Sequence, residues 1–378
     1  MRFYKIYQEF EMKFQFDRNS MIKEISIAQE IIANKSPISI LSNILLEARE
    51  NTLTIKASDA TVNYVTRIPV EIQEEGTTTI YCDKFMRILS TSPAGMIEFD
   101  QKDILVTIRP VSKKVKFQLK SIASDKFPEI ESTENVSYFE VPAKEIKEMI
   151  AQTSFAVSDD GNRHFMMGVY FEKEEDNLIM VATDGRRLSY ESKSIGQGVP
   201  NFPAAIVPTK ILDCVLKNCS NEGNISIAVI DKMIFFKFGN YEFSSLLLEG
   251  EFPNYRRVIP QNLTQNFEVE KSDLEEALSR IGIMVDKNSS RIIFKLNPGQ
   301  LTLISPESDI GNADEEIPCK YDGGEVLLAF NFKYIEEPLK KTDATRIAFD
   351  FIDPNKAVIL RTEPKSDYFH VIMTMNLN

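Results

Sequence analysis

The chain has 378 residues, of which 43% are hydrophobic and 26% charged, and its net charge is −12. The length exceeds what one ordinary core accommodates, so we expect two or three domains of a soluble globular protein. The acidic balance argues against a nucleic-acid coat, and the apolar runs are too short for a membrane span. Met1–Phe10 mixes charged and aromatic residues where a signal peptide has an unbroken apolar core, so we expect a cytoplasmic protein.

Cysteine and histidine are too few and too scattered to predict a metal site. The four cysteines show no CxxC spacing, and only two histidines, His164 and His370, are available as further ligands. We therefore predict reduced thiols in the interior and no metal or other cofactor. The cysteines are Cys82, Cys214, Cys219 and Cys319.

Each third of the chain begins with a predicted strand followed by an amphipathic helix. The three strands are expected at Phe14–Phe16, Tyr138–Val141 and Phe267–Val269. In the middle third, Pro142 is expected at the start of this helix, and in the last third Ser272-Asp273 is expected to cap it. The apolar positions at helical spacing are Ile22, Ile25, Ala28 and Ile32; Ile146, Met149, Ile150 and Thr153; and Leu274, Ala277, Leu278 and Ile281.

Two strands joined by a turn follow each helix, and then comes a second helix. In the middle third the turn lies inside Val181–Leu188, where Asp184-Gly185 tolerates the positive φ of a tight hairpin. The corresponding turns are expected at Ser58–Ala60 and Ser305–Glu307. The second helices are expected at Asp83–Ser92, Thr209–Cys219 and Asn331–Lys341.

Three further alternating runs close each third, so the chain reads as one unit repeated three times. The fold class is α+β, with three tandem domains that each place two helices on antiparallel sheets. The predicted boundaries are 1–11 for an N-terminal extension and 12–137, 138–260 and 261–378 for the three domains. The repeats can pair edge to edge along the chain, and the edges left open at its two ends suit a second copy in a six-unit ring.

The second helices are slightly basic within an acidic chain, since each carries a net charge of +1. Few positive charges predict weak, sequence-independent and salt-sensitive contacts with a nucleic-acid backbone. The cations that we expect to face DNA from these helices are Lys84, Arg87, Lys210, Lys217 and Lys333.

A competing interpretation is that the protein is an enzyme whose catalytic carboxylates come from Asp59, Asp184 or the acidic runs. An apolar strand ending in Asp184 could hold magnesium in a nucleotide hydrolase, but that chemistry needs a GxxxxGK[ST] loop, and none is present. The chain also offers no nucleophile–base pair or metal-ligand cluster. We therefore predict that the protein is not an enzyme.

Four separated stretches resemble the bacterial replicative sliding clamp, the beta subunit of DNA polymerase III. They are ISILSNILLE at Ile38–Glu47, VATDGRRL at Val181–Leu188, EFPNYRRVIP at Glu251–Pro260 and VIMTMNL at Val371–Leu377. The resemblance implies a non-catalytic head-to-tail ring dimer around duplex DNA that tethers the polymerase and so confers processivity. A peptide-binding scaffold that does not encircle DNA is the alternative.

The resemblance also implies a pocket into which partners insert a short apolar peptide. The expected partners are the DNA polymerase III alpha subunit, the clamp loader, other polymerases and repair proteins, and we expect no membrane. The adaptable side chains of Met373 and Met375 suit several peptides, and Arg187 and Arg257 are expected to contact peptide carbonyls or a polar side chain. The pocket residues implied are Arg163, Met166, Thr183, Gly185, Arg187, Leu188, Pro253, Arg257, Val258, Val371, Met373, Met375 and Leu377.

Two further surfaces follow from the resemblance. The additional DNA-facing residues implied are Lys35, Arg163, His164 and Phe165. The dimer interface implied pairs Lys114, Lys116, Phe117 and Leu119 with Ile283, Met284, Glu307, Asp309, Glu315 and Glu316, which sets opposite charges around an apolar centre. The tail departs from the family pattern, with Thr374 where proline is common and Asn376 where arginine is common.

Overall fold

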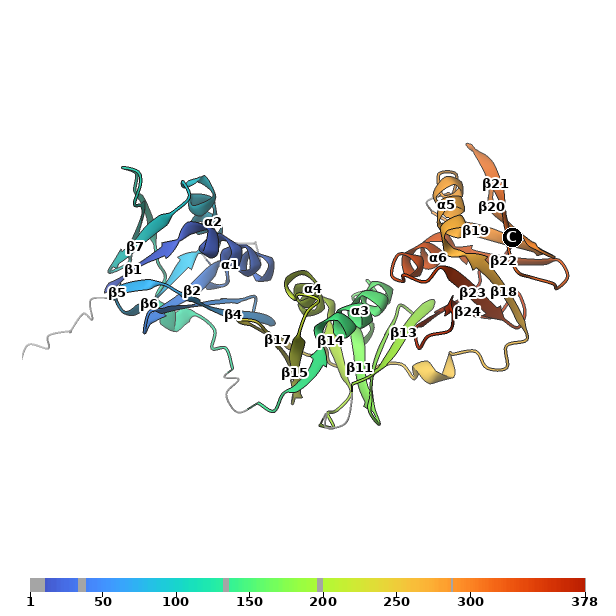
Figure 1. Ribbon diagram of the computed structural model, residues 1–378, viewed down its shortest axis with the longest axis horizontal. Coiled ribbons are helices and arrows are strands. Elements are labelled where there is room, and N and C mark those ends of the chain that lie inside the picture. The colour runs from blue at the N-terminus through green and yellow to red at the C-terminus, as the bar shows by residue number, and fades with distance from the viewer. Residues whose placement is uncertain (1–10, 33–38, 132–135, 196–199, 287, 378) are drawn as a thin grey trace, which may run out of the picture. The chain divides into compact units, whose positions relative to one another are not determined.

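The computed structural model describes residues 11–32, 39–131, 136–195, 200–286 and 288–377, and its ribbon is drawn in Figure 1. The chain divides into two compact units: residues 1–141 with 213–246, and residues 142–212 with 247–378. Each unit therefore combines strands from two of the three sequence repeats.

The first unit contains a five-stranded antiparallel sheet that carries two helices. Phe14 and Phe99 stack with their ring centroids 4.7 Å apart, and Phe85 of the second helix meets Phe99 edge to face, so these aromatics join helix and sheet. The helices are α1 (Arg18–Ile31) and α2 (Cys82–Thr91). In sheet order the strands are β5 (Glu71–Glu74), β1 (Glu11–Asp17), β7 (Met96–Lys102), β8 (Leu105–Pro110) and β9 (Phe117–Lys120).

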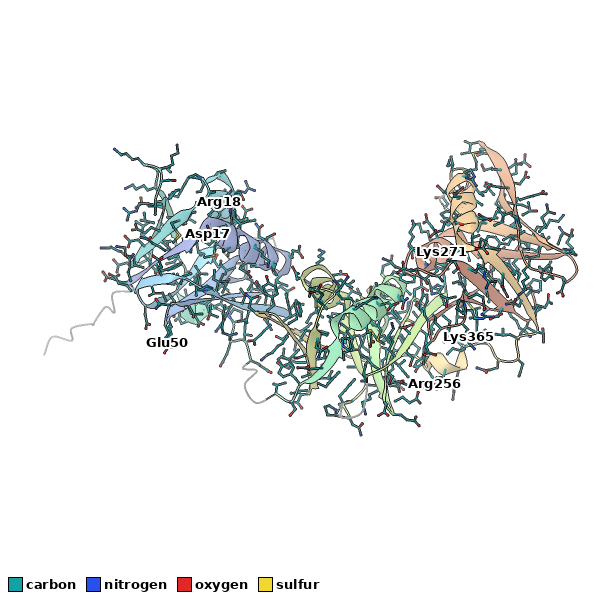
Figure 2. The ribbon with its side chains drawn as sticks, viewed as in Figure 1. Asp17, Arg18, Glu50, Arg256, Lys271 and Lys365 are labelled. Atoms are coloured by element: carbon teal, nitrogen blue, oxygen red, sulfur yellow. The ribbon has the colours of Figure 1, made fainter. Side chains whose placement is uncertain are left out.

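Polar contacts fix where α1 begins (Figure 2). The Asp17 carboxylate accepts a hydrogen bond from Ser20 N at 2.9 Å and caps the helix. The Arg18 guanidinium donates to Leu89 O at 2.8 Å and to Ser90 O at 3.0 Å near the end of α2. The two helices of this repeat are thereby tied together at one end.

The second sheet of the first unit joins the first two repeats. Strand β17 pairs antiparallel with β4, from Tyr241 opposite Thr66 to Ser245 opposite Val62. Glu24 of α1 is buried and accepts hydrogen bonds from Tyr64 and Tyr241, one from each repeat. In sheet order the strands are β10 (Phe139–Pro142), β15 (Asn224–Ile230), β16 (Met233–Phe238), β17 (Tyr241–Leu246), β4 (Val62–Pro69), β3 (Thr52–Ser58), β2 (Asn43–Arg49) and β6 (Gly76–Tyr81).

The second unit repeats this arrangement between the middle and last repeats. Strand β13 pairs antiparallel with β25, from Arg187 opposite Ile372 to Tyr190 opposite Phe369. Both pairings confirm that the repeats join edge to edge along the chain. In sheet order the strands are β14 (Ala205–Pro208), β11 (Gly168–Glu174), β12 (Asn177–Thr183), β13 (Arg187–Ser194), β25 (Phe369–Ile372), β24 (Val358–Glu363), β23 (Arg346–Phe351) and β18 (Gln265–Glu270).

A four-stranded sheet and three helices complete the second unit. In sheet order the strands are β21 (Gly311–Pro318), β20 (Gln300–Ser308), β19 (Arg291–Asn297) and β22 (Val326–Asn331). The helices are α3 (Ala143–Thr153), α5 (Lys271–Ile281) and α6 (Phe332–Leu339). Helix α4 (Thr209–Asn218) contains the division between the units. Short 3₁₀ turns are η1 (Ile40–Ser42), η2 (Ser124–Lys126), η3 (Ser154–Ala156), η4 (His164–Met166) and η5 (Tyr255–Arg257).

The helical stripes predicted for α3 and α5 are buried at every position. In α1 the buried stripe includes Met21, and Ile22 is only half-buried. Three of the four cysteines are buried and Cys319 is half-buried, so the prediction of interior thiols holds for three. Within the described ranges, no helix has the length and apolar character needed to cross a membrane.

The expected cap of α5 is wrong. The helix begins at Lys271 with Glu270 as its N-cap, so Ser272-Asp273 lies inside the first turn. Long-range contacts decide the start: Lys271 N donates to Thr345 O at 2.8 Å, and its ammonium donates to Thr342 O at 2.8 Å (Lys271 is labelled in Figure 2).

The turn expected at Ser305–Glu307 is also wrong. Strand β20 continues to Ser308, and the pairing shifts register between Ser305 and Ser308. A bulge therefore holds Pro306 within the strand, which is where proline is tolerated in a sheet. The chain reverses at Asp309 and Ile310, because Ser308 pairs with Gly311 of β21.

Candidate functional site

The turn between β12 and β13 is a rigid backbone corner, and we call Thr183–Arg187 the 183–187 turn. Gly185 has φ of 88°, a conformation that favours glycine. The Thr183 hydroxyl accepts from Gly185 N at 3.0 Å and donates to Arg187 O at 2.6 Å. The Asp184 carboxylate accepts from Arg186 N at 2.8 Å and from Arg187 N at 3.0 Å. Asp184 therefore holds the turn.

The 183–187 turn forms one wall of a small apolar cavity of about 120 Å³, which we call the tail pocket. The second wall comes from the segment around η5, and the third comes from β25 and the residue that follows it. No carboxylate lines the cavity. The lining residues are Met166, Thr183, Gly185, Arg186, Arg187, Leu188, Pro253, Asn254, Tyr255, Val258, Val371 and Met373.

Exposed apolar side chains lie at the rim of the tail pocket. Val258 is 55% exposed and Met373 is 48% exposed, whereas Leu188 and Val371 at its floor are buried. When a ligand covers apolar atoms that are in contact with water, the free energy of the system falls. The cavity can thus bind an apolar side chain of a partner.

Hydrogen bonds from its backbone fix the C-terminal tail in place. Met373 N donates to Arg186 O at 3.0 Å, and Met375 N donates to Ala329 O at 2.8 Å. The Arg291 guanidinium donates to Asn376 O at 3.2 Å. After it leaves the tail pocket, the tail is therefore bonded to β22 and to β19.

Arg187 lines the tail pocket, but its guanidinium is bonded inside the protein. Its side chain is 8% exposed. Nε donates to Asp184 Oδ2 at 3.1 Å, Nη2 donates to Phe155 O at 2.8 Å, and Nη1 bonds to the carboxylate of Glu337. Three of the five guanidinium N–H groups are therefore engaged inside the protein, and contact of Arg187 with peptide carbonyls stays a prediction.

Arg163 supports the turn from behind and does not line the tail pocket. Its Nη1 donates to Asp184 O at 3.0 Å, and its Nε donates to Asp160 Oδ2 at 2.9 Å. A Cβ added at Gly185 would lie 3.0 Å from this Nη1, so the end of the Arg163 side chain would have to move by a few tenths of an ångström.

The other expected pocket residues divide into two groups. Eight besides Arg187 line the tail pocket: Met166, Thr183, Gly185, Leu188, Pro253, Val258, Val371 and Met373. Arg163, Arg257, Met375 and Leu377 do not. Sequence reasoning missed Arg186, Asn254 and Tyr255, although all three lie inside the quoted motifs and between residues that were named.

The residues expected to face DNA are mostly exposed, and several have acidic neighbours. Lys84, Arg87, His164, Lys217 and Lys333 are exposed, whereas Arg163, Phe165 and Lys210 are half-buried. Arg87 pairs with Asp83 at 3.1 Å, and Lys217 pairs with Glu30 at 3.3 Å. Lys35 lies outside the described residues.

The residues expected at the dimer interface gather at sheet edges, each set within its own unit. In the first unit, Phe117 and Leu119 are half-buried on the edge strand β9, after the exposed Lys114 and Lys116. In the second unit, Glu315 and Glu316 lie on the edge strand β21, and Glu307 and Asp309 lie at the end of β20 and in the turn that follows it.

Apolar side chains accompany this second edge. Ile283 is 77% exposed and Met284 is half-buried, and Ser305 Oγ donates to Met284 O at 2.8 Å. Ile310 in the β20–β21 turn is 78% exposed, and sequence reasoning missed it. An isolated isoleucine in an otherwise polar turn was the signal available.

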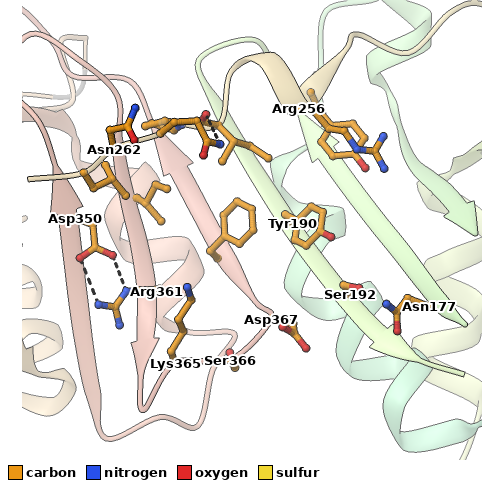
Figure 3. A pocket seen from close by; sticks show the side chains of 17 residues that line it. Asn177, Tyr190, Ser192, Arg256, Asn262, Asp350, Arg361, Lys365, Ser366 and Asp367 are labelled. Carbon is orange, nitrogen blue, oxygen red and sulfur yellow. Dashed lines mark hydrogen bonds and ion pairs between the residues drawn. The ribbon is translucent and has the colours of Figure 1, made fainter. Parts of the chain in front are cut away.

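A larger cavity of about 660 Å³ lies on the eight-stranded sheet of the second unit (Figure 3). Its floor includes Tyr190 stacked on Phe369, with their ring centroids 4.6 Å apart. Arg361 bonds to Asp350 at 2.5 Å, and Arg256 pairs with Glu172 at 3.0 Å. Two of its cations are engaged in this way, and its lining also includes the charged Lys365 and Asp367 and the aliphatic side chains of Ile259, Leu263 and Ile359.

Within the described ranges, no group of three or more His, Cys, Asp or Glu side chains is placed to hold a metal ion.

Family models match nearly the whole chain. The N-terminal domain of the DNA polymerase III beta subunit matches residues 12–131, its central domain matches residues 140–254 and its C-terminal domain matches residues 256–376. The chain belongs to the DNA polymerase III beta subunit family.

Relatives of this sliding-clamp family match over their full length. The Beta sliding clamp of Treponema pallidum is 42% identical over 368 residues, which cover 96% of this chain and 99% of the relative. That of Escherichia coli K12 is 26% identical over 371 residues, covering 97% and 100%. A crystal structure of the Pseudomonas aeruginosa sliding clamp bound to griselimycin aligns with a TM-score of 0.90 at 25% identity, covering 97% and 100%.

The fold extends to more distant sliding clamps. The crystal structure of the Bacillus subtilis DNA polymerase sliding clamp aligns with a TM-score of 0.93 at 22% identity, covering 97% of this chain and 100% of that one. Because the family models and the relatives span nearly the whole chain, the chain is a DNA sliding clamp with three clamp domains, a class of protein without catalytic activity.

Proposed function

We propose that two copies of this clamp close head to tail around duplex DNA and that its tail pocket tethers replication proteins to the template. The observation that carries the proposal is the apolar tail pocket in a chain of the sliding-clamp family. Tethering raises the effective concentration of a polymerase at the primer end, so processivity follows without any chemical step. Because the relatives are bacterial clamps, we place the protein in the cytoplasm, where bacterial DNA lies.

Two open sheet edges support a head-to-tail contact. Strand β9 ends one sheet of the first unit, and β21 ends one sheet of the second. Unpaired edges invite pairing with another chain, and a contact between two different edges closes into a ring when the geometry allows. Lys114 and Lys116 beside β9 complement Glu307 and Glu316 near β21 in charge, which would fix the register of the contact.

We also propose that the clamp domains meet near residues 137 and 260. The face that meets DNA would carry five cations, which are Lys84, Arg87, Lys210, Lys217 and Lys333. Their contacts would go to phosphates, and few such contacts suit sliding because they are sequence-independent and weaken with salt.

The tail pocket would take the short apolar peptides of the polymerase III alpha subunit, the clamp loader, other polymerases and repair proteins. Its rim carries Val258 and Met373, which a bound peptide would cover. The side chain of Met373 is flexible and polarisable, so it can adapt to peptides of different sequence.

Retention on DNA of different topology tests the ring. Clamp loaded onto nicked circular DNA should co-elute with it and should be lost when the circle is linearised, and light scattering should give the mass of a dimer. Lys84→Glu with Lys333→Glu should reduce retention, whereas the exposed Lys126→Glu should not. A monomeric protein, or retention that ignores topology, would refute encirclement and favour a scaffold that only binds peptides.

A further inference from the structure

Two side chains of α6 hold the buried arginine of the tail pocket. We propose that Glu337 and Tyr334 are positioning residues for partner binding, because they fix Arg187 and through it the 183–187 turn. The proposal rests on the proposed function of the tail pocket as the partner site. It assigns to a helix outside the cavity a role in setting the shape of its wall.

The Arg187 guanidinium contacts two aromatic rings. Its centre is 4.6 Å from the Tyr334 ring centroid and 5.5 Å from that of Phe155. Cation–π contacts of this kind strengthen when the cation is removed from water, and this side chain is 8% exposed. The rings restrict the plane of the guanidinium and leave its edges to hydrogen-bond partners.

Three elements receive the hydrogen bonds from those edges. Nε donates to Asp184 in the turn, Nη2 to Phe155 O in η3, and Nη1 to Glu337 in α6. A planar guanidinium with fixed donors suits this geometry, because each partner defines one direction. Glu337 is the carboxylate partner that comes from outside the turn.

The same arginine lines the tail pocket, and its backbone is bonded within the 183–187 turn. Arg187 O accepts from the Thr183 hydroxyl at 2.6 Å, and Arg187 N donates to Asp184 Oδ1 at 3.0 Å. Asp184 thus bonds the backbone of the turn with one carboxylate oxygen and the guanidinium with the other. A change in the guanidinium position therefore changes the turn.

Loss of Glu337 would leave one carboxylate, Asp184, for a buried cation. A buried charge that loses a partner is destabilised unless water or another acceptor replaces that partner. The Glu337 side chain is 34% exposed, so its loss would also let water reach Nη1. Arg187 would then lose one of the bonds that fix it and, through it, the 183–187 turn that lines the tail pocket, so peptide affinity should fall.

The tyrosine of the pair stays neutral in this site. Burial, followed by the charge of Asp184, raises the pKa of Tyr334 above its ordinary value. A neutral ring keeps its electron-rich face toward the guanidinium over the working pH range. Tyr334 therefore supports the orientation that Glu337 fixes.

Fluorescence anisotropy tests the role of Glu337 with a fluorescein-labelled synthetic peptide that carries the clamp-binding segment of the polymerase III alpha subunit. Glu337→Ala should raise the Kd about tenfold. Glu337→Gln keeps an acceptor for Arg187 and should recover affinity to within about threefold of the unaltered protein. Glu336→Gln on the same helix loses only an exposed ion pair with Lys340 and should bind unchanged.

A variant that destabilises the fold elsewhere in α6 serves as a control, because it distinguishes general loss of stability from loss of the Arg187 contact. Leu339→Ala removes a fully buried side chain of α6 without touching Arg187, so it should lower the thermal midpoint and leave the Kd within twofold. The methyl-¹³C signal of Met373 in the free protein should shift in Glu337→Ala and return toward its position in Glu337→Gln. Unchanged affinity in Glu337→Ala, or equal loss in Leu339→Ala, would overturn the inference. Failure of the unaltered protein to bind would instead refute the proposed pocket.

Discussion

Shortening Met373 to alanine tests how much of the affinity for partners comes from the rim of the tail pocket. Met373 follows β25, and its backbone N–H is fixed by Arg186 O at 3.0 Å. The substitution keeps that hydrogen bond and removes only the flexible side chain, so the tail should stay in place. The expected result is weaker peptide binding with little change in fold stability.

The size of the effect follows from the exposure of the side chain. Met373 is 48% exposed in the free protein, so a covering peptide can bury about half of it. Full burial of a methionine side chain contributes about 1.5–3 kcal/mol, and half of that is about 1 kcal/mol. Loss of about 1 kcal/mol raises the Kd about fivefold.

Isothermal titration with the alpha-subunit peptide measures this change, and the heat-capacity change of binding should become less negative because less apolar surface is buried. Ile230→Ala is the matched control, since Ile230 is 36% exposed on β15 in the first unit. A Kd for Met373→Ala within 1.5-fold of the unaltered protein would show that a bound peptide does not cover this rim. A loss beyond a hundredfold would show that the side chain also shapes the free pocket.

Three other substitutions test the fold. Burial raises the pKa of Glu191 to about 8, so the native state binds an extra proton between roughly pH 4.5 and 8 and loses stability as the pH rises through that range. Glu191→Gln should therefore stabilise by roughly 1–3 kcal/mol more at pH 8.5 than at pH 5 in urea unfolding, and a gain independent of pH would contradict this. Gly168→Ala would place a Cβ 2.6 Å from Val207 O and should cost about 1–3 kcal/mol in calorimetry, whereas Gly161→Ala, with nothing within 4 Å, should not. Phe349→Ala removes a fully buried ring and should cost about 3–5 kcal/mol of unfolding free energy; a cost below about 1 kcal/mol would contradict its place in the core.

Local patterns predicted the helices and the repeat well. The stripe Leu274, Ala277, Leu278 and Ile281 is buried at each position because helical periodicity is a property of neighbouring residues. The hairpin at Asp184-Gly185 also forms as predicted, since the turn needs only a positive φ at glycine and an aspartate that bonds the next backbone N–H groups.

Errors occurred where distant segments decide the local structure. The chain does not turn at Ser305–Glu307, because β21 pairs with β20 as far as Ser308. The start of α5 moved to Lys271 because Thr345 O accepts its backbone N–H. Neither partner is visible in the local sequence, so turn and cap propensities alone gave the wrong residues.

The sequence pattern by itself indicated the triple repeat and the pairing of repeats along the chain, and its resemblance to sliding clamps indicated the segments that form the tail pocket. The tertiary structure alone decided what each side chain in those segments does. Arg187 looks in sequence like a surface arginine beside a turn, and its enclosure by Phe155, Tyr334 and Glu337 depends on three elements meeting. Side-chain environment arises from long-range packing, so a motif can locate a site before it can assign the role of each residue within it.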